Sequence, residues 1–243
     1  MVSPGLMHRL ADEGKSLVLL DGHGRFKARL EGPVSGNVLL RQAQHRRAAT
    51  TDFCLAAAKS FIAGKLKNCR QVLRRGARET GRVDDGEQLG KAAEELGRAL
   101  ARLEYAADLD AVRGIEGDAA KRYFAVLGLM VRPEVRGGFT PNGRTRRPPL
   151  DRMNALLSFL YALLMNDVRS ALESVGLDPQ VGFLHALRPG RAALALDLME
   201  EFRPVLADRL ALTLVNRRQL DVDDFVEHPG GAVTLKDDAR RAL

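Results

Sequence analysis

The spacing of apolar residues changes once along the chain, and the change predicts two kinds of structure. Short apolar runs at 16–20 and 25–30 flank the turn sequence Asp21-Gly22-His23-Gly24, which is typical of a β-hairpin. Before them, Ser3-Pro4 opens a short predicted helix over 4–13. Because a single hairpin is marginally stable in water, we expect the chain to begin inside a sheet whose other strands lie before Val2.

After a Gly- and Pro-containing linker at 31–36, apolar residues recur at steps of three and four, which predicts helices. A basic loop with Gly and Pro is predicted over 139–149. The fold class is therefore mainly α, with the remnant of a small N-terminal β domain at 1–31 and a helical domain at 32–243. The predicted helices cover about 37–75, 86–106, 109–131, 151–176, 190–202 and 204–219.

Charge is unevenly distributed along the chain. The 38 basic and 31 acidic side chains give a net charge of +7, but residues 1–80 alone carry 15 basic and 6 acidic side chains. Thirty of the basic residues are arginine, whose planar fork suits phosphate. A GC-rich genome would also raise the arginine content, although it would not bias its position. The distribution favours a polyanionic partner such as nucleic acid.

Several classes of protein are excluded by composition. The two cysteines, Cys54 and Cys69, have no CxxC spacing, which argues against a disulfide scaffold or a zinc finger and fits a reducing cytoplasm. The longest stretch without charge or strong polarity near its centre, 155–165, is shorter than a membrane helix requires, and no secretory leader is recognisable. A Gly-rich phosphate loop, GxSxG and HExxH are all absent from the sequence.

Glu116 interrupts an apolar helix face. Its stripe continues through Ala120, Tyr123 and Leu127, so the carboxylate is predicted to point inward, where it needs a positive partner. The alternative is an exposed acid near a helix start that follows Gly114.

A second group of acids lies on one predicted helix. Asp197 and Glu200 are three residues apart and share a face, so an arginine or a metal ion should lie between them. Pro204 places Glu200 close to a helix distortion. The alternative is a solvated acidic face, which is the interpretation that we give to Glu201.

His185 is the one histidine in an apolar setting, after Val181-Gly-Phe-Leu184 and shortly before the acids. Taken alone it has a structural explanation, whereas the other histidines, His8, His23, His45 and His228, are predicted to be at the surface. Together, one imidazole and several carboxylates from separate helices form a mixed site of the kind that holds Mg²⁺ or Mn²⁺. Arg144, Arg146 and Arg147 in the basic loop are candidates for binding the phosphates of DNA.

Five segments, in order along the chain, resemble motifs of the CRISPR-associated adaptation endonuclease/integrase family. Members of this family are the larger subunit of the spacer-acquisition complex. The five segments are EGPVSGNVLLRQAQHR from Glu31, GIEGDAAKRYF from Gly114, NGRTRRPPLDRMNALLSFLYALL from Asn142, GLDPQVGFLH from Gly176 and LALDLMEEFRP from Leu194. The resemblance implies an N-terminal β domain, a helical catalytic domain, a homodimer and a small ferredoxin-like partner subunit. It also implies metal-dependent cleavage and joining of duplex DNA, namely a spacer precursor and a CRISPR repeat.

By position in these motifs, the resemblance assigns the metal ligands to Glu116, His185 and Glu200 and a further catalytic acid to Asp197. The competing hypothesis is a catalytically silent DNA-binding or assembly subunit, which would bind no metal. We expect the helical part from about Asn37 to fold without the missing strands. A fragment without them should dimerise weakly and integrate poorly.

Overall fold

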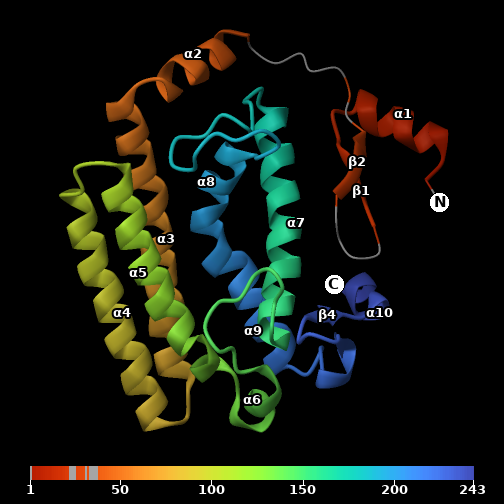
Figure 1. Ribbon diagram of the computed structural model, residues 1–243. Coiled ribbons are helices and arrows are strands. Elements are labelled where there is room, and N and C mark those ends of the chain that lie inside the picture. The colour runs from red at the N-terminus through yellow and green to blue at the C-terminus, as the bar shows by residue number, and fades with distance from the viewer. Residues whose placement is uncertain (1, 22–25, 31, 33–37) are drawn as a thin grey trace. The chain divides into compact units, whose positions relative to one another are not determined.

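The computed structural model describes residues 2–21, 26–30, 32 and 38–243, and the protein is mainly helical (Figure 1). Its α-helices are α1 (Pro4–Asp12), α2 (Val38–Ala48), α3 (Thr51–Glu79), α4 (Val83–Glu104), α5 (Leu109–Val126), α6 (Pro133–Phe139), α7 (Arg152–Ser174), α8 (Ala193–Phe202), α9 (Arg209–Asn216) and α10 (Asp237–Ala242). Short 3₁₀ turns, η1 (Leu127–Met130) and η3 (Val222–Asp224), and a π-helical segment, η2 (Arg203–Asp208), lie between them. The strands are β1 (Leu17–Leu20), β2 (Phe26–Leu30), β3 (Phe225–Glu227) and β4 (Val233–Leu235).

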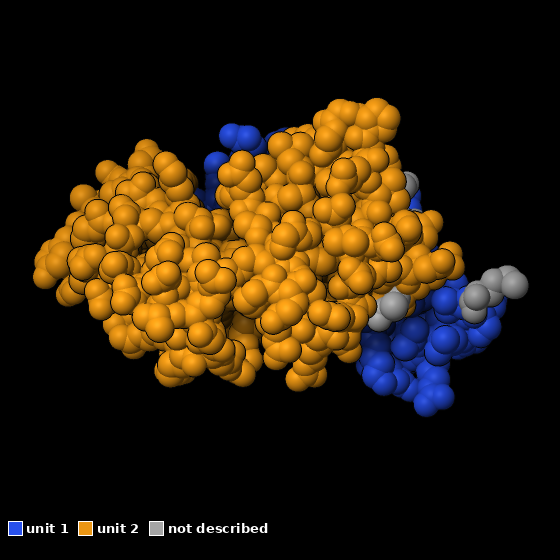
Figure 2. Space-filling view, turned by 90° about the horizontal axis from the view of Figure 1, so that it is seen from below, with its two compact units in different colours: residues 1–57, 162–199 blue, residues 58–161, 200–243 orange. Residues whose placement is uncertain are grey.

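The chain divides into two compact units (Figure 2). The first contains residues 1–57 and 162–199, and the second contains residues 58–161 and 200–243. The divisions fall inside α3, α7 and α8, so each of these helices contributes residues to both units. The predicted boundary between 31 and 32 stays a prediction.

In the first unit, the predicted hairpin is confirmed. Strands β1 and β2 pair antiparallel, with Leu17 opposite Leu30. Arg29 of β2 forms an ion pair with Glu173 of α7, and both side chains are largely buried. The residues of the predicted turn at 22–24 lie outside the described part of the chain, as does most of the predicted linker.

In the second unit, α4 and α5 pack side by side (Figure 1). Leu89, Leu96 and Leu103 recur every seven residues along α4 and are fully or almost fully buried. This spacing returns the side chains to the same face after two turns, so that they form a continuous apolar seam. Farther along, the rings of Phe139 and Phe225 meet edge to face at 5.7 Å.

The predicted helix over 37–75 is divided in two by a break at residues 49 and 50. The apolar spacing continues across residues 49 and 50 and therefore does not reveal the break. The local sequence does, because Thr50, Thr51 and Asp52 are typical of a helix start. The Thr50 carbonyl accepts from the amide of Cys54 at 3.0 Å, which begins the hydrogen-bond ladder of α3.

The distortion predicted at Pro204 is confirmed as the π-helical segment Arg203–Asp208. Proline has no N–H to donate to the carbonyl four residues earlier, which belongs to Glu200. A π turn, with hydrogen bonds between residues five apart, keeps the chain helical at this point.

Four short helices and strands were not predicted. Helix α6 has seven residues, two of them glycine, which is too short for a periodic signal. Strands β3 and β4 have three residues each, and α10 has six. Helix α7 is long and apolar enough to span a bilayer by length and composition, but it buries Met153, Leu156 and Leu157 completely in the protein.

Candidate functional site

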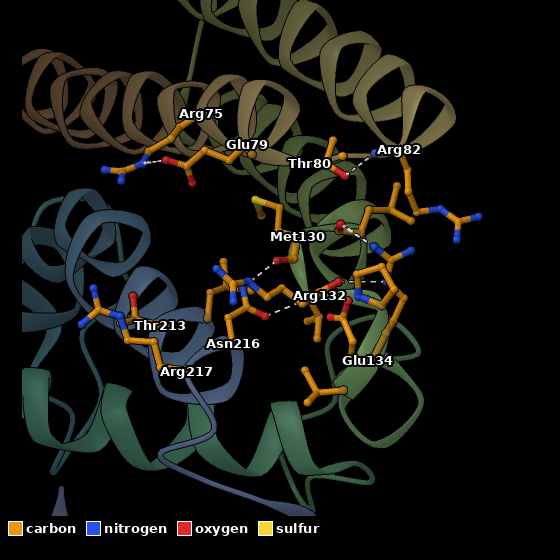
Figure 3. Close-up of a pocket in the computed structure, with 18 of the residues that line it drawn as sticks. Arg75, Glu79, Thr80, Arg82, Met130, Arg132, Glu134, Thr213, Asn216 and Arg217 are labelled. Carbon is orange, nitrogen blue, oxygen red and sulfur yellow. Dashed lines mark hydrogen bonds and ion pairs between the residues drawn. The ribbon is translucent and has the colours of Figure 1, made fainter.

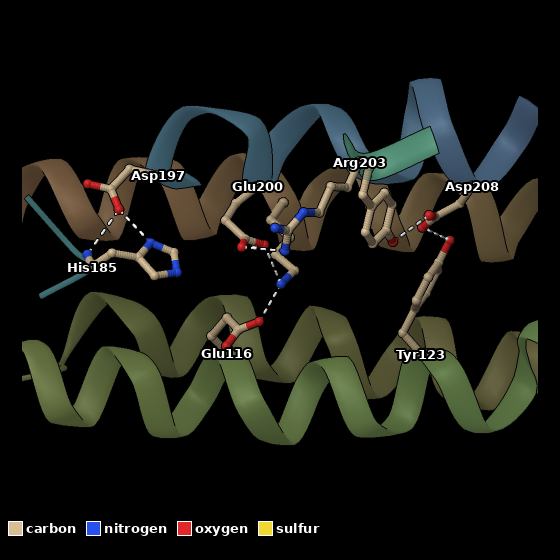
Figure 4. A network of polar contacts seen from close by, with 9 residues as sticks. Glu116, Tyr123, His185, Asp197, Glu200, Arg203 and Asp208 are labelled. Carbon is tan, nitrogen blue, oxygen red and sulfur yellow. Dashed lines mark hydrogen bonds and ion pairs between the residues drawn. The ribbon is translucent and has the colours of Figure 1, made fainter. Parts of the chain in front are cut away.

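Glu116 and Glu200 lie in the second unit and share one cation, the ammonium group of Lys65 (Figure 4). Glu116 comes from the middle of α5, Glu200 from α8 and Lys65 from α3. Lys65 Nζ lies 2.6 Å from Glu200 Oε2 and also forms an ion pair with Glu116 Oε1. The inward position predicted for Glu116 is therefore confirmed, and the solvated alternative for Glu200 is wrong, since Glu200 is 4% exposed.

Two positive side chains neutralise Glu200. Besides Lys65, Arg203 donates to Glu200 Oε1 at 2.5 Å from one turn further along the chain. Burial disfavours the charged form of Lys65, but the charges of Glu200 and Glu116 outweigh it and raise the pKa of this lysine above its ordinary value. The lysine therefore stays protonated, and a permanent positive charge lies between the two carboxylates.

Another buried carboxyl group, that of Asp208, lies at the end of the π-helical segment η2, which follows α8. Tyr161 donates to its Oδ1 at 2.6 Å and Tyr123 donates to its Oδ2 at 2.9 Å (Figure 4). Burial raises the pKa of Asp208 to about 6, although both tyrosine hydrogen bonds act in the opposite direction. Burial also raises the pKa of both tyrosines well above the ordinary value. The sequence placed Tyr123 on the stripe of Glu116 but gave no sign of its partner.

Aromatic rings connect this network to the basic residues. Arg203 lies over the ring of Tyr161 at 4.9 Å from its centroid, and Arg144 lies over the same ring at 5.3 Å. A cavity of about 20 Å³, room for about one water molecule, is lined by Lys65, Asp208 and these three side chains among others. Cations and hydroxyl groups thus surround the space beside the paired glutamates.

The three arginines predicted to bind DNA have different environments. Arg144 is half-buried, donates to Asn154 Oδ1 at 2.8 Å and stacks on Tyr161, so it supports the site from within. Arg146 and Arg147 are exposed in the loop that the sequence predicted. Both are therefore accessible to a ligand, and Arg146 also lines the small cavity.

His185 and Asp197 form a second polar group, which lies in the first unit. Asp197 is completely buried, and its Oδ1 lies 2.7 Å from Nδ1 of His185 (Figure 4). Its oxygens also accept from the backbone amides of Phe183, Leu184 and His185, at 2.6 to 2.9 Å. Asp197 therefore holds both the loop and the imidazole of His185.

This arrangement fixes which nitrogen of His185 can bind a ligand. A carboxylate that accepts from Nδ1–H leaves Nε2 as the nitrogen with a free lone pair. The loop can approach α8 closely because residue 182 is glycine, and an added Cβ would lie 2.7 Å from Asp197 Oδ2.

The predicted site residues thus fall into two groups. Glu116 and Glu200 come together through Lys65, and His185 comes together with Asp197, one turn from Glu200 on α8. Convergence of all three predicted ligands on one ion stays a prediction. Sequence reasoning missed Lys65 and Asp208, because a single lysine in a long amphipathic helix and a single aspartate carry no distinguishing pattern. The described histidines outside the site, His8, His45 and His228, are exposed as predicted.

Comparison with known proteins gives consistent matches. The family model for the CRISPR associated protein Cas1 matches residues 1–243. "CRISPR-associated endonuclease Cas1 1" of Moorella thermoacetica is 58% identical over 98% of this chain and 69% of the relative.

Solved structures agree with the sequence comparison. A CAS1 protein from Thermotoga maritima has a TM-score of 0.82 at 26% identity, over 100% of this chain and 73% of that one. A casposase bound to integration product has a TM-score of 0.79 at 25% identity, over 99% of this chain and 65% of that one. A partial Cas6-RT-Cas1–Cas2 complex contains a chain with a TM-score of 0.77 at 28% identity, over 99% of this chain and 71% of that one.

Proposed function

Because the chain belongs to the CRISPR-associated Cas1 family of endonucleases, we propose that it cleaves and joins DNA with a divalent metal ion held by Glu116, Glu200 and His185. The observation that carries the proposal is the pair of carboxylates, Glu116 and Glu200, that share one buried cation. The likeness to a casposase bound to integration product supports strand joining as the reaction.

The residues present fit a metal ion by their chemistry. Carboxylate oxygens with one imidazole nitrogen suit Mg²⁺ or Mn²⁺. Lys65 shows that the oxygens of Glu116 and Glu200 can face a common positive charge. Within the part of the chain that the structure describes, no three acidic, histidine or cysteine side chains already converge, so binding would require the side chains to rearrange around Lys65.

When bound, the metal would polarise a phosphate oxygen and stabilise the charge that develops on the leaving oxygen. Glu116 and Glu200 would hold the ion, and His185 would present Nε2 because Asp197 holds Nδ1. Asp197 is then a positioning residue, since its oxygens are occupied by the loop amides and the imidazole.

In the joining reaction, a terminal 3′-hydroxyl of one DNA attacks a phosphodiester of another. The attacking hydroxyl loses its proton as a new P–O bond forms, the bond to the original 3′-oxygen breaks, and that oxygen takes up a proton. Attack by water gives cleavage in place of joining. Lys65 and Arg203 keep positive charge beside the reacting phosphate, which carries extra negative charge as it passes through the transition state.

Partners follow from the same family. We propose a homodimer and assembly with a small ferredoxin-like subunit, supported by the likeness to a chain of a Cas1–Cas2 complex. Its DNA partners would be a spacer precursor and a CRISPR repeat.

The test is calorimetric titration of Mn²⁺ into the wild type, Glu116→Gln and Glu201→Gln. Glu201 is the matched control, because it adjoins Glu200 and its carboxylate forms no ion pair in the described part of the chain. The prediction that Glu201 is solvated is wrong, since it is half-buried and lies against Gly64 of α3. We expect Glu116→Gln to lose Mn²⁺ binding and the joining of labelled DNA strands, and Glu201→Gln to keep both. A silent DNA-binding subunit would show no Mn²⁺ binding in any of the three and no effect of Glu116→Gln on its DNA affinity.

A further inference from the structure

A large groove lies in the second unit, away from the paired glutamates. It has a volume of about 1180 Å³ and is lined by the C-terminal ends of α3 and α9 together with η1 and α6 (Figure 3). Seven arginines and two glutamates are among its lining residues, and none of the described lining residues is lysine. The groove is therefore strongly positive, and its charges are guanidinium groups, which match the geometry of phosphate.

Buried contacts fix the walls of the groove. Asn216 at the end of α9 donates to the carbonyl of Met130 at 2.9 Å and accepts from the amide of Arg132 at 2.8 Å (Figure 3). Behind it, Asp85 is buried and pairs with Arg136 at 2.8 Å. A preformed shape of this kind reduces the entropy that a ligand must offset on binding.

Four of the arginines are available for a ligand. Arg132, Arg209, Arg217 and Arg218 are exposed, and their side chains make no ion pair or hydrogen bond with the described part of the chain. Arg136, in contrast, is paired with Asp85. Four exposed guanidinium groups gathered around one hollow give it a positive potential that would attract an external anion.

The backbone at Arg218 gives an independent indication. It has φ +55°, the left-handed conformation that favours glycine. Its amide donates to the Val215 carbonyl at 3.0 Å, and the amide of Gln219 donates to the Leu214 carbonyl at 2.8 Å, so it closes α9 in a Schellman motif. Glycine would fit this position with less strain, so arginine at this position lowers the stability of the folded protein.

The lining distinguishes between possible polyanions. Of its apolar side chains, Val72, Val131 and Leu212 are buried, Leu129, Met130 and Val135 are half-buried, and Pro133 is exposed. Anchors for the aliphatic side chains of an acidic peptide are therefore few beside seven arginines. None of the described lining residues is aromatic, which disfavours the stacked bases of a single strand. The phosphate backbone of a DNA duplex fits best, because it is bound by positive charge and requires no apolar contacts.

The groove is a separate place from the site of the proposed reaction. Lys65 and Arg75 lie ten residues apart on α3, which corresponds to about 15 Å along the helix axis. A duplex held in the groove could therefore continue towards the glutamates without its phosphates competing for the same position.

We propose that this groove, formed by the ends of α3 and α9 with α6, is a second DNA-binding surface that grips the backbone of a duplex without reading its sequence. The choice of DNA as the ligand rests on the proposed function. Joining two DNA segments requires the protein to hold both, and the groove supplies a hold outside the reacting centre.

The experiment measures the binding of a fluorescein-labelled 30-base-pair duplex by anisotropy, in EDTA, across a series of NaCl concentrations. The groove variant carries Arg132→Gln, Arg209→Gln, Arg217→Gln and Arg218→Gln. The matched control carries Lys91→Gln, Arg98→Gln, Arg102→Gln and Lys121→Gln, four exposed basic residues of α4 and α5 with no ion pair in the described structure. We expect the slope of log affinity against log salt to flatten by about 3 to 4 in the groove variant, with binding at least about tenfold weaker, and to change less in the control.

A single substitution tests the groove without risk to folding. Arg218→Gly should raise the melting temperature by about 2–4 °C, because the left-handed conformation suits glycine, and should still weaken duplex binding. Weaker binding by a more stable protein cannot come from misfolding.

Two results would overturn the proposal. One is an equal change of salt slope in the groove variant and the control. The other is a groove variant that keeps its duplex affinity but loses binding of a labelled polyglutamate peptide, which would identify an acidic protein segment as the ligand. Because EDTA removes the metal, these measurements stand even if Mn²⁺ binding and strand joining fail.

Discussion

Lys65 shows how much one buried side chain can determine. It is 7% exposed and faces Glu116 and Glu200, which without it would point two negative charges at each other. Removal of Lys65 would leave Glu116 without this ion pair and Glu200 paired with Arg203. Breaking a buried ion pair by removing one partner is strongly destabilising.

We therefore predict that Lys65→Met lowers the free energy of unfolding by about 3–5 kcal/mol in metal-free buffer. Lys67→Met is the control, since Lys67 is exposed on the same helix and should leave stability close to wild type. Addition of Mn²⁺ should restore part of the loss, because the metal replaces the missing positive charge. Urea denaturation with and without Mn²⁺ measures both effects, and equal stabilities for the two variants would disprove the role of Lys65.

Asp208 predicts a dependence of stability on pH. Its pKa is about 6 in the folded protein against an ordinary value of 3.8, because it is buried. Between these values the folded state keeps a proton that the unfolded state has lost, so the free energy of unfolding falls as pH rises.

The expected loss from Asp208 between pH 4 and pH 7 is about 2 kcal/mol, and Asp208→Asn should remove it. The measurement is the difference in unfolding free energy between wild type and variant at several pH values. Asp223→Asn, an exposed control, should show no such difference. A constant difference between wild type and Asp208→Asn across this range would show that Asp208 is ionised in the folded protein.

At the scale of elements, the loop that carries His185 is held by side chains from two helices. From α2, the buried Gln44 donates to the carbonyls of Asp178 and Val181 at 2.7 and 2.9 Å and accepts from the amide of Asp178 at 2.9 Å. From α8, Asp197 accepts from three further amides. The loop has no regular structure, and these hydrogen bonds satisfy its buried backbone groups instead.

Gly182 allows this loop to lie against α8. A Cβ at this position would lie 2.6 Å from the backbone carbon of Ala193 and would also meet Asp197, so Gly182→Ala should cost about 1–3 kcal/mol of stability. Gly90→Ala is the control, because nothing lies within 4 Å of its Cβ and alanine favours a helix interior. Thermal unfolding should show opposite shifts, and a Gly182→Ala protein as stable as wild type would contradict the close approach.

The long helices were predictable because their apolar stripes repeat over many turns. The paired glutamates were predictable in part, because a carboxylate on an apolar face requires a positive partner. Lys65, Asp208 and the support of the loop by Gln44 were not, since each depends on contacts between segments 51 to 137 residues apart or on the burial of a single residue. Such contacts follow from the packing of whole helices and leave no local pattern.

At the scale of the whole molecule, exposed apolar side chains are concentrated near the N-terminus. Leu19 and Leu20 of β1 are 42% and 37% exposed, and Val38 and Leu39 at the start of α2 are 64% and 68% exposed. Strands β1 and β2 form a sheet of two among the described residues, a small sheet that a further strand could extend. These features favour association with a second copy, in agreement with the proposed homodimer.

We predict that Leu19→Lys with Leu20→Lys weakens self-association about tenfold or more, because two charges would have to be buried at the interface. Val83→Lys with Tyr105→Lys is the control, since these residues are 77% and 82% exposed elsewhere in the chain. Sedimentation velocity over a range of protein concentrations measures the effect. Dimerisation that survives the first pair of changes would place the interface away from the hairpin.

The π-helical segment at Arg203–Asp208 has a consequence for variation in chain length. A single π turn contains one residue more than the α turn it replaces, so it changes the direction in which every later side chain points. If this segment became an ordinary α-helix without losing a residue, Asp208 would rotate by about 100° away from Tyr123 and Tyr161. Relatives that keep the two tyrosines and the aspartate should therefore have either this π segment or an ordinary α-helix with one residue fewer between the glutamate and the aspartate.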